Sequence, residues 1–160
     1  AANSRREETP EVAELIICVT SAPANTHLRN IVRQTWGREP NVHTAAGPFR
    51  VRVLFFMADS LEAFEEHERL GDVVVLRDLQ ENFANIWAKT AAILKFGADY
   101  LQERIPEAQS RGRPPLRYLL KCDDDAFIDI DNIASDLLSV SPVGLYWGHV
   151  MALVEPNRIQ

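Results

Sequence analysis

The chain has 160 residues, 46% hydrophobic and 25% charged, so it can bury a core and is neither disordered nor fibrous in composition. Its net charge of −6 comes without a cluster of Lys and Arg, which excludes the usual basis of nucleic-acid binding. No apolar run approaches the ~20 residues of a bilayer-spanning helix, and the polar first residues do not resemble a signal peptide.

Strand-like and helix-like patterns alternate along the chain. The apolar run at 15–20 is typical of a strand covered on both faces. After a turn at 21–25, apolar residues recur at helical spacing up to Trp36, and Gly37 predicts the end of that helix. The further predicted elements are a loop at 38–48, a strand at 51–57, a helix at 61–70 capped by Ser60, a strand at 73–76, a helix at about 82–103, a loop at 105–115, a strand at 117–122, a helix from Asp131 as its cap to about 140, and a strand at 144–150.

This alternation predicts an α/β fold with a mainly parallel sheet and helices on both faces. Residues 15–160 are expected to form one domain, preceded by a polar tail at 1–14. The longest helix has a periodic apolar face, which predicts its buried side. That face comprises Phe83, Ile86, Trp87, Thr90, Ile93, Leu94, Ala98 and Leu101.

Three carboxylates, Asp123, Asp124 and Asp125, directly follow the strand at 117–122. Because side chains alternate along a strand, Asp123 and Asp125 are expected on one face and Asp124 on the other. Two carboxylates at the carboxyl edge of a sheet suit a hard divalent cation that also keeps phosphate and water ligands. The alternative is a solvated acidic turn. Thr20, Ser21 and the Asp78 region lie at the carboxyl ends of other predicted strands, and open α/β sheets bind ligands at this edge.

Two cysteines, Cys18 and Cys122, lie in predicted buried strands. They either act as small buried hydrophobes or, in an oxidising compartment, form a disulfide, although cross-strand pairs seldom meet its geometry. The four His residues are scattered and no CxxC occurs, so a zinc site is not expected.

Five blocks, in order, resemble the β1,3-galactosyltransferase family, glycosyltransferase family 31, which also holds β1,3-N-acetylglucosaminyltransferases. The blocks are 29–37 (R-x-x-I-R-x-T-W-G), the hydrophobic strand 53–57, 78–90 (D-F-x-D-S-Y-x-N-L-x-x-K-T), 121–127 (K-x-D-D-D-x-F) and 145–148 (L-Y-x-G). Departures are Leu79 for the aromatic residue, Glu81 and Asn82 for Asp-Ser, and Trp87 for a small residue. The E-D-V-x-x-G motif that follows in the family does not occur up to Gln160.

The resemblance implies a GT-A-like fold, incomplete here because the C-terminal part is missing, with the catalytic base outside this chain. It implies inverting, metal-dependent β1,3 transfer of galactose or an N-acetylhexosamine from a UDP-sugar to a glycan of a glycoprotein or glycolipid. Members of the family are typically type II membrane proteins of the Golgi lumen, so an anchor absent from this chain is expected in the full-length parent. Mn²⁺ or Mg²⁺ is the expected cofactor.

The same resemblance suggests roles for the acidic residues. Asp125 is the first choice as metal ligand, with Asp123 either a second ligand or a contact to ribose or to a metal-bound water. Asp124 is either part of the donor site or a structural acceptor for backbone N–H groups. Asp78 is expected to hold uracil or ribose, or else, as a residue of a strand-to-helix turn, only to cap.

Basic residues complete the predicted donor site. Arg29 and Arg33, four residues apart on one helical face, suit diphosphate oxygens, and the alternative is a solvated helix face. Lys89 is expected near the donor or in solvent. Trp36, Trp87 and Trp147 are most simply core residues, although Trp147 could lie under the transferred sugar.

Two further function classes stay open. One is a non-catalytic nucleotide-binding or UDP-sugar-binding module, which the missing acidic motif favours. The other is a phosphoryl-transfer or response-regulator-like protein, whose acidic cluster also holds Mg²⁺; it leaves the blocks at 29–37 and 78–90 unexplained.

Overall fold

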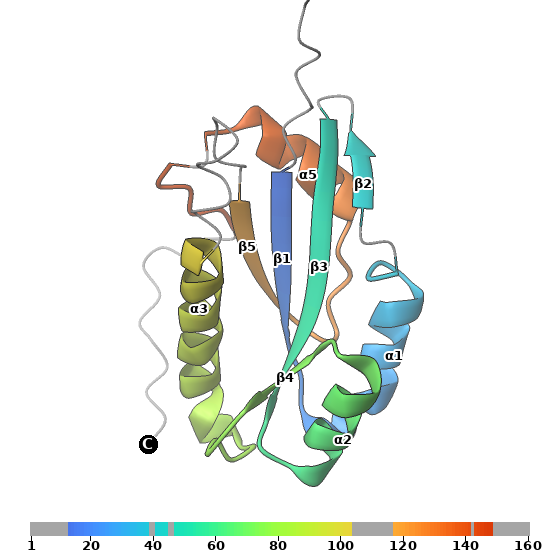
Figure 1. The fold of residues 1–160 in the computed structure, drawn as a ribbon, viewed down its shortest axis with the longest axis vertical. Helices are drawn as coiled ribbons and strands as arrows, with labels where there is room; N and C mark the ends of the chain where they lie inside the picture. The colour runs from blue at the N-terminus through green and yellow to red at the C-terminus, as the bar shows by residue number, and fades with distance from the viewer. Residues whose placement is uncertain (1–12, 39–40, 45–46, 104–116, 142, 149–160) are drawn as a thin grey trace, which may run out of the picture.

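The computed structural model describes residues 13–38, 41–44, 47–103, 117–141 and 143–148, and a twisted sheet runs through its centre (Figure 1). The four parallel strands are β1 (Ala13–Thr20), β3 (Gly47–Ala58), β4 (Val73–Leu76) and β5 (Arg117–Asp123), and the antiparallel one is β2 (Asn41–Thr44). β3 and β5 flank β1, while β2 and β4 pair with separate stretches of the outer edge of β3. The predicted GT-A-like, mainly parallel α/β architecture is confirmed.

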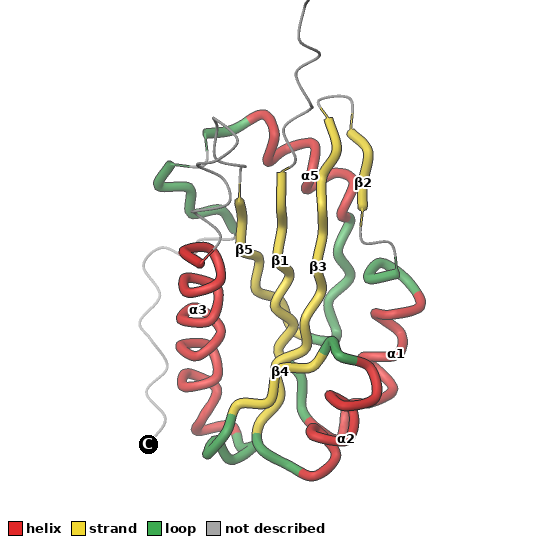
Figure 2. The backbone as a smooth tube through the Cα atoms, in the orientation of Figure 1, coloured by secondary structure: helices red, strands yellow, loops and turns green. Residues whose placement is uncertain are grey.

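Helices cover both faces of the sheet (Figures 1 and 2). They are α1 (Thr26–Gln34), α2 (Leu61–Leu70), α3 (Ile86–Glu103) and α5 (Ile130–Ser139), with short 3-10 helices η1 (Pro23–Asn25) and η2 (Phe83–Asn85) before α1 and α3. Helices α1, α2 and α5 contribute to the core on one face, and α3 contributes to the core on the other.

Strand β1 is buried on both faces, as its continuous apolar run predicts. Leu15, Ile17 and Val19 face the core of α1, α2 and α5, whereas Ile16 and Cys18 face α3. Complete burial of a side chain of this size contributes about 1.5–3 kcal/mol, so β1 is the main apolar anchor of the layers.

The ends of two helices follow from local chemistry. Ser60 Oγ accepts a hydrogen bond from the Ala63 N–H at 3.1 Å, and Gly71 ends α2 with φ of 71°, which confirms the predicted helix. The predicted cap Asp131 is wrong: Asp129 Oδ1 accepts from the Asn132 N–H at 3.1 Å, because α5 begins at Ile130, two residues earlier than a cap at Asp131 predicts.

Some predicted boundaries need correction. The predicted loop 38–48 contains β2, whose short polar segment lacks a strand-like apolar pattern and forms only by pairing with β3. Strand β1 begins at Ala13, inside the predicted tail. No strand forms at residues 144–148, where a final strand was expected; 149–150, the loop 105–115 and the tail 1–12 lie outside the described residues.

The buried face of α3 also differs from the prediction. Phe83, Ile86, Trp87 and Leu94 are exposed, with Phe83 at 74% and Trp87 at 72%. Residues that do face the sheet are Lys89, Ile93 and Gly97, together with part of Phe96 and Tyr100. A Cβ on Gly97 would lie 2.7 Å from Leu119 Cδ2, so glycine permits this close approach of α3 to β5.

The sequence contains no apolar run long enough for a membrane-spanning helix. Among the residues that the structure describes, no helix is both long and apolar enough to cross a bilayer.

The two cysteines lie on opposite faces of the sheet. Cys18 belongs to the core beside α3, while Cys122 packs against the core of α1, α2 and α5. Both thiols are free. Burial raises the pKa of Cys18 to about 12, with a smaller contribution from Cys122. Burial, and next the charge of Asp123, raises the pKa of Cys122 to about 12.

We therefore expect two free, poorly reactive thiols. At pH 8 a pKa of about 12 leaves roughly 1,000-fold less thiolate than the ordinary thiol pKa of 9.0 would, and the thiolate is the reactive species. Ellman's reagent should titrate both thiols at once in guanidinium but only slowly in the native chain. A disulfide in the non-reduced mass, or a fast native thiol, would contradict this arrangement.

Candidate functional site

Ser21, the first residue after β1, connects the parts of the carboxyl edge. Its N–H donates to Phe56 O at 3.1 Å, and its carbonyl accepts from Lys89 Nζ at 3.0 Å. Its Oγ accepts from Arg29 Nη1 at 2.8 Å and donates to Asp124 Oδ2 at 2.7 Å. The residue is 3% exposed. Through Ser21, residues of β3, α3, α1 and the acidic turn meet at one point.

Arg29 is fully buried and forms a two-point ion pair with Glu66 of α2. Its Nε lies 2.9 Å from Glu66 Oε1, and its Nη2 lies 2.6 Å from Oε2. All three guanidinium nitrogens donate hydrogen bonds. The remaining acceptors are Ser21 Oγ, Ala22 O, Pro23 O and Thr26 Oγ1.

The inward side of α1 therefore carries charge. Arg29 and Val32 are buried there, while the apolar Ile31 is 53% exposed. The solvated-face alternative is wrong for Arg29, which is 0% exposed. A direct contact between Arg29 and phosphate stays a prediction, and it would have to compete with Glu66.

Arg33 binds a second carboxylate, at a distance from the acidic turn. Its Nε and Nη2 donate to Asp72 Oδ2 and Oδ1 at 2.7 and 2.9 Å, and Nη2 also donates to Glu66 Oε1 at 2.7 Å. The guanidinium carbon lies 4.6 Å from the centre of the Phe55 ring. These contacts fix Arg33 over the edge of β3, and its role in donor binding stays a prediction.

The shared partner of the two arginines is Glu66. Burial would raise the pKa of this carboxyl, but hydrogen bonds from Arg29 and Arg33 outweigh burial and hold the pKa below its usual value. Glu66 therefore stays ionised at neutral pH, as a buried acceptor for two cations requires.

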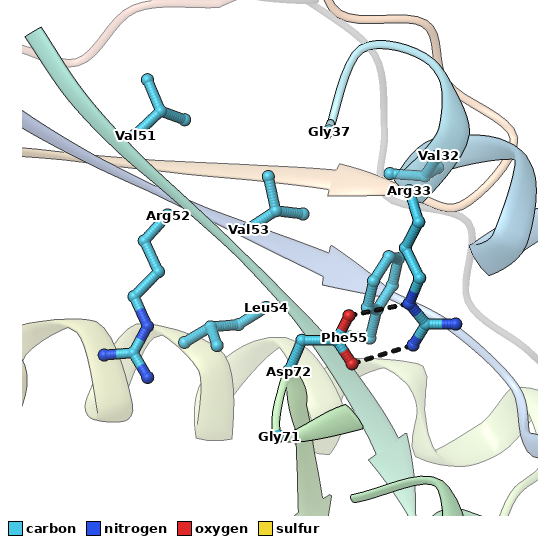
Figure 3. Close-up of a pocket in the computed structure, with 10 residues that line it drawn as sticks. All are labelled: Val32, Arg33, Gly37, Val51, Arg52, Val53, Leu54, Phe55, Gly71 and Asp72. Carbon is cyan, nitrogen blue, oxygen red and sulfur yellow. Dashed lines mark hydrogen bonds and ion pairs between the residues drawn. The ribbon is translucent and has the colours of Figure 1, made fainter. Parts of the chain in front are cut away.

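Arg33 and Asp72 line a pocket of about 280 Å³ (Figure 3). It lies at the edge of β3 between the stretches that pair with β2 and with β4. The lining residues are Val32, Arg33, Gly37, Val51, Arg52, Val53, Leu54, Phe55, Gly71 and Asp72. Arg33 of the predicted donor site lines this pocket, whereas none of the three adjacent aspartates does, and no prediction from the sequence placed a pocket at this edge of β3.

The three aspartates have different surroundings. Asp123 ends β5 opposite Thr20 of β1; its side chain is 64% exposed and accepts from Lys121 Nζ at 3.0 Å. Asp124 accepts from Ser21 Oγ and, at 2.9 Å, from Asn25 Nδ2. Asp124 is thus a structural acceptor, although its donors are side chains rather than the expected backbone N–H groups. Asp125 is exposed in the turn.

Two observations bear on a metal ion. In the described part of the chain, no group of three or more His, Cys, Asp or Glu side chains could hold a metal ion by itself. Thr20 Oγ1, opposite Asp123 in the strand register, is buried and has no hydrogen-bond partner among the residues that the structure describes. Sites for Mg²⁺ commonly use one or two carboxylates and take other ligands from substrate phosphates. Asp123 and Asp125 fit a cation shared with a diphosphate, and not a site made by protein alone.

Lys89 and Asp78 support the same edge in different ways. Lys89 is 4% exposed and donates to Ser21 O and to both carboxylate oxygens of Glu81, at 2.8 and 2.7 Å. The expectation that Lys89 is solvated is wrong. Asp78 is exposed with φ of 62°, and its N–H donates to Asp59 Oδ2 at 3.2 Å. Asp78 is therefore a turn residue at the end of β4. It is not the cap that its alternative role predicted, because Asn82 caps η2 and accepts from the Asn85 N–H. A contact between Asp78 and uracil or ribose stays a prediction.

A tryptophan connects the end of α1 to the acidic turn. Trp36 Nε1 donates to Ala126 O at 3.1 Å, and its ring packs against the core. A Cβ on the next residue, Gly37, would lie 2.9 Å from Val32 O, so glycine is needed where the chain leaves the helix. Trp36 confirms the core prediction, whereas Trp87 and Trp147 are 72% and 57% exposed and do not.

The fold and this edge define a class of α/β proteins with an acidic turn after a parallel strand. The chain belongs to the galactosyltransferase family, whose model matches residues 27–143. The match covers α1, the sheet from β3 to β5, and the acidic turn.

Similar proteins carry related names. The chain is 31% identical to mouse beta-1,3-galactosyltransferase 6 over 85% of its own length and 40% of that protein. It is 29% identical to rat beta-1,3-galactosyltransferase 4 over 78% of its length and 30% of the relative. It is 26% identical to mouse acetylgalactosaminyl-O-glycosyl-glycoprotein beta-1,3-N-acetylglucosaminyltransferase over 93% of its length and 37% of the relative. The chain thus spans less than half the length of these relatives.

We expect Arg29→Ala to lower the free energy of unfolding by about 3–5 kcal/mol, because it removes one partner of a buried ion pair. Lys95→Ala is the matched control: Lys95 is 76% exposed in its pair with Asp99, and its loss should cost less than about 1 kcal/mol. Urea unfolding followed by circular dichroism measures both. Equal losses for the two variants would show that the buried pair does not hold α1 in place.

Proposed function

We propose that this chain binds the UDP-sugar donor of a β1,3-hexosyltransferase at the carboxyl edge of its sheet. The observation that carries this proposal is that the three aspartates of the acidic turn have different contacts. Asp124 is held by Ser21 and Asn25, while Asp123 and Asp125 are exposed at the edge where open α/β sheets bind ligands. Family membership and the names of the relatives supply the reaction type.

Within this proposal, the diphosphate lies beside Asp123 and Asp125, which hold Mn²⁺ or Mg²⁺ together with it. When bound, the cation neutralises charge on the leaving diphosphate. Thr20 Oγ1, buried and unpartnered among the described residues, offers a hydrogen bond at the same place. Asp78, in the turn after β4, accepts from uracil or ribose. Lys89 and Arg29 both donate to Ser21 and so fix the geometry of this edge.

The remaining parts of the proposal follow the family. The donor sugar is galactose or an N-acetylhexosamine, the acceptor is a glycan on a protein or lipid, and transfer inverts the anomeric carbon. The parent protein acts in the Golgi lumen as a type II membrane protein. The domain comprises residues 15–160 together with Ala13 and Glu14 at the start of β1. A non-catalytic UDP-sugar-binding module is the alternative function.

We expect UDP to bind at least about 10-fold more tightly with Mn²⁺ than in EDTA, because the cation offsets diphosphate charge against the carboxylates. Asp125→Ala should abolish this difference. Asp136→Ala, an exposed aspartate of α5, is the control and should bind like the parent. Titration calorimetry with UDP gives all three values, and equal affinity in EDTA and Mn²⁺ for the parent would exclude a bridging cation.

We also expect the chain alone to transfer no sugar above background hydrolysis. An inverting transferase needs a base within hydrogen-bond reach of the acceptor hydroxyl. Asp124 is engaged by Ser21 and Asn25, and Asp129 caps α5, so neither is available. A radiolabelled UDP-sugar assay with β-galactoside and N-acetylhexosaminide acceptors measures this. Turnover would show that a carboxylate of this edge is the base, and would also exclude the non-catalytic alternative.

A further inference from the structure

We propose that Ser21 is a positioning residue. The Arg29–Glu66 ion pair fixes the Ser21 hydroxyl, and the hydroxyl in turn fixes the Asp124 side chain. By holding the middle aspartate, it sets the direction in which the flanking Asp123 and Asp125 point. The use of those two carboxylates rests on the proposed function. The positioning itself rests only on contacts within the chain.

The polarity of this hydrogen-bond chain is fixed by its first member. A guanidinium has only donors, so Ser21 Oγ must accept from Arg29 Nη1. The single hydroxyl proton of Ser21 is then directed to an acceptor. Asp124 Oδ2 lies at 2.7 Å and Ala22 O at 3.4 Å, so the carboxylate is the better acceptor. The order is therefore Arg29 to Ser21 to Asp124.

Burial makes the hydrogen-bond chain from Arg29 to Asp124 rigid. Arg29, Ser21 and Glu66 are 0%, 3% and 5% exposed, so water cannot replace a lost partner at Ser21 without a rearrangement. Hydrogen bonds are stronger in such an environment, and an unpaired buried group is costly. Because the pair with Glu66 holds Arg29 at two points, the Ser21 hydroxyl is held in one place.

Hydrogen bonds hold the acidic turn at the Asp124 side chain, at the Asp123 carbonyl and at the Ala126 carbonyl. Asp124 accepts from Ser21 and from Asn25, both in the connection between β1 and α1. The Ala126 N–H donates to Asp123 O at 3.2 Å, and Ala126 O accepts from Trp36. Asp124 is the only one of the three aspartates whose side chain accepts hydrogen bonds from this connection, among the contacts of the described residues. Loss of the Ser21 hydroxyl should therefore loosen the turn while the ion pair stays intact.

The first test compares Ser21→Ala with Thr26→Val. Both remove a hydroxyl that accepts from Arg29, but only Ser21 also contacts Asp124. Amide hydrogen exchange of the peptide 121–128 should become about 10-fold faster in Ser21→Ala and stay unchanged in Thr26→Val. Should Ser21→Ala fail to fold, Asn25→Ala removes the other donor to Asp124 and should give the same direction.

The second test asks whether Ser21 acts through Asp124. In Mn²⁺, UDP affinity should fall about 10-fold in Ser21→Ala, because displaced ligands lose much of their effect. Asp124→Asn alone and the double variant complete a cycle, and the two losses should not add. Thr26→Val should bind UDP like the parent.

The outcomes separate the two proposals. Unchanged exchange at 121–128 in a folded Ser21→Ala chain overturns the positioning role, and so do additive losses in the cycle. A parent chain that binds no UDP with either cation contradicts the proposed function instead. In that case the exchange rates still decide whether Ser21 positions the turn.

Discussion

Two arginines, Arg29 and Arg33, share one buried carboxylate, Glu66, and this cluster joins α1 and α2 beside the carboxyl edge of the sheet. Burial of charge is costly, so such a cluster persists only where every member is paired. Here the pairing extends beyond the ions, because Arg29 also orders Ser21, and Ser21 orders Asp124. The shape of the acidic turn thus depends on Arg29 of α1 and Glu66 of α2, which are linked to it through Ser21.

The same contacts give a physical reason for the spacing within the family blocks. In 29–37, Arg29 reaches the edge through Ser21, and Trp36 donates to the carbonyl of Ala126 in the acidic turn. In the block 78–90, Lys89 donates a hydrogen bond to the carbonyl of Ser21. Three blocks distant in the sequence therefore meet around one serine.

Much of the fold follows from the sequence. Strands β1 and β4 are continuous apolar runs, and α2 has a cap at each end, Ser60 and Gly71. The short strand β2 could not be predicted, since its pairing with β3 decides its conformation. The face of α3 was misjudged because periodicity favoured its large apolar residues, whereas Lys89 and Gly97 contact the sheet. The motif indicated Arg29 and Asp124, but their mutual link through Ser21 depends on tertiary distances that no spacing reveals. The pocket beside Arg33 was not predicted for the same reason, although the blocks at 29–37 and 53–57 supply several of its lining residues.

The most direct measurement is paramagnetic broadening of amide signals by Mn²⁺ in the presence of UDP, with Mg²⁺ as the diamagnetic reference. The account predicts that the signals of Thr20, Asp123 and Asp125 broaden first, because the cation lies at the carboxyl edge. Signals of Val53 and Asp72, which line the pocket at the edge of β3, should broaden less. Broadening centred on that pocket, or no broadening that depends on UDP, would contradict the account.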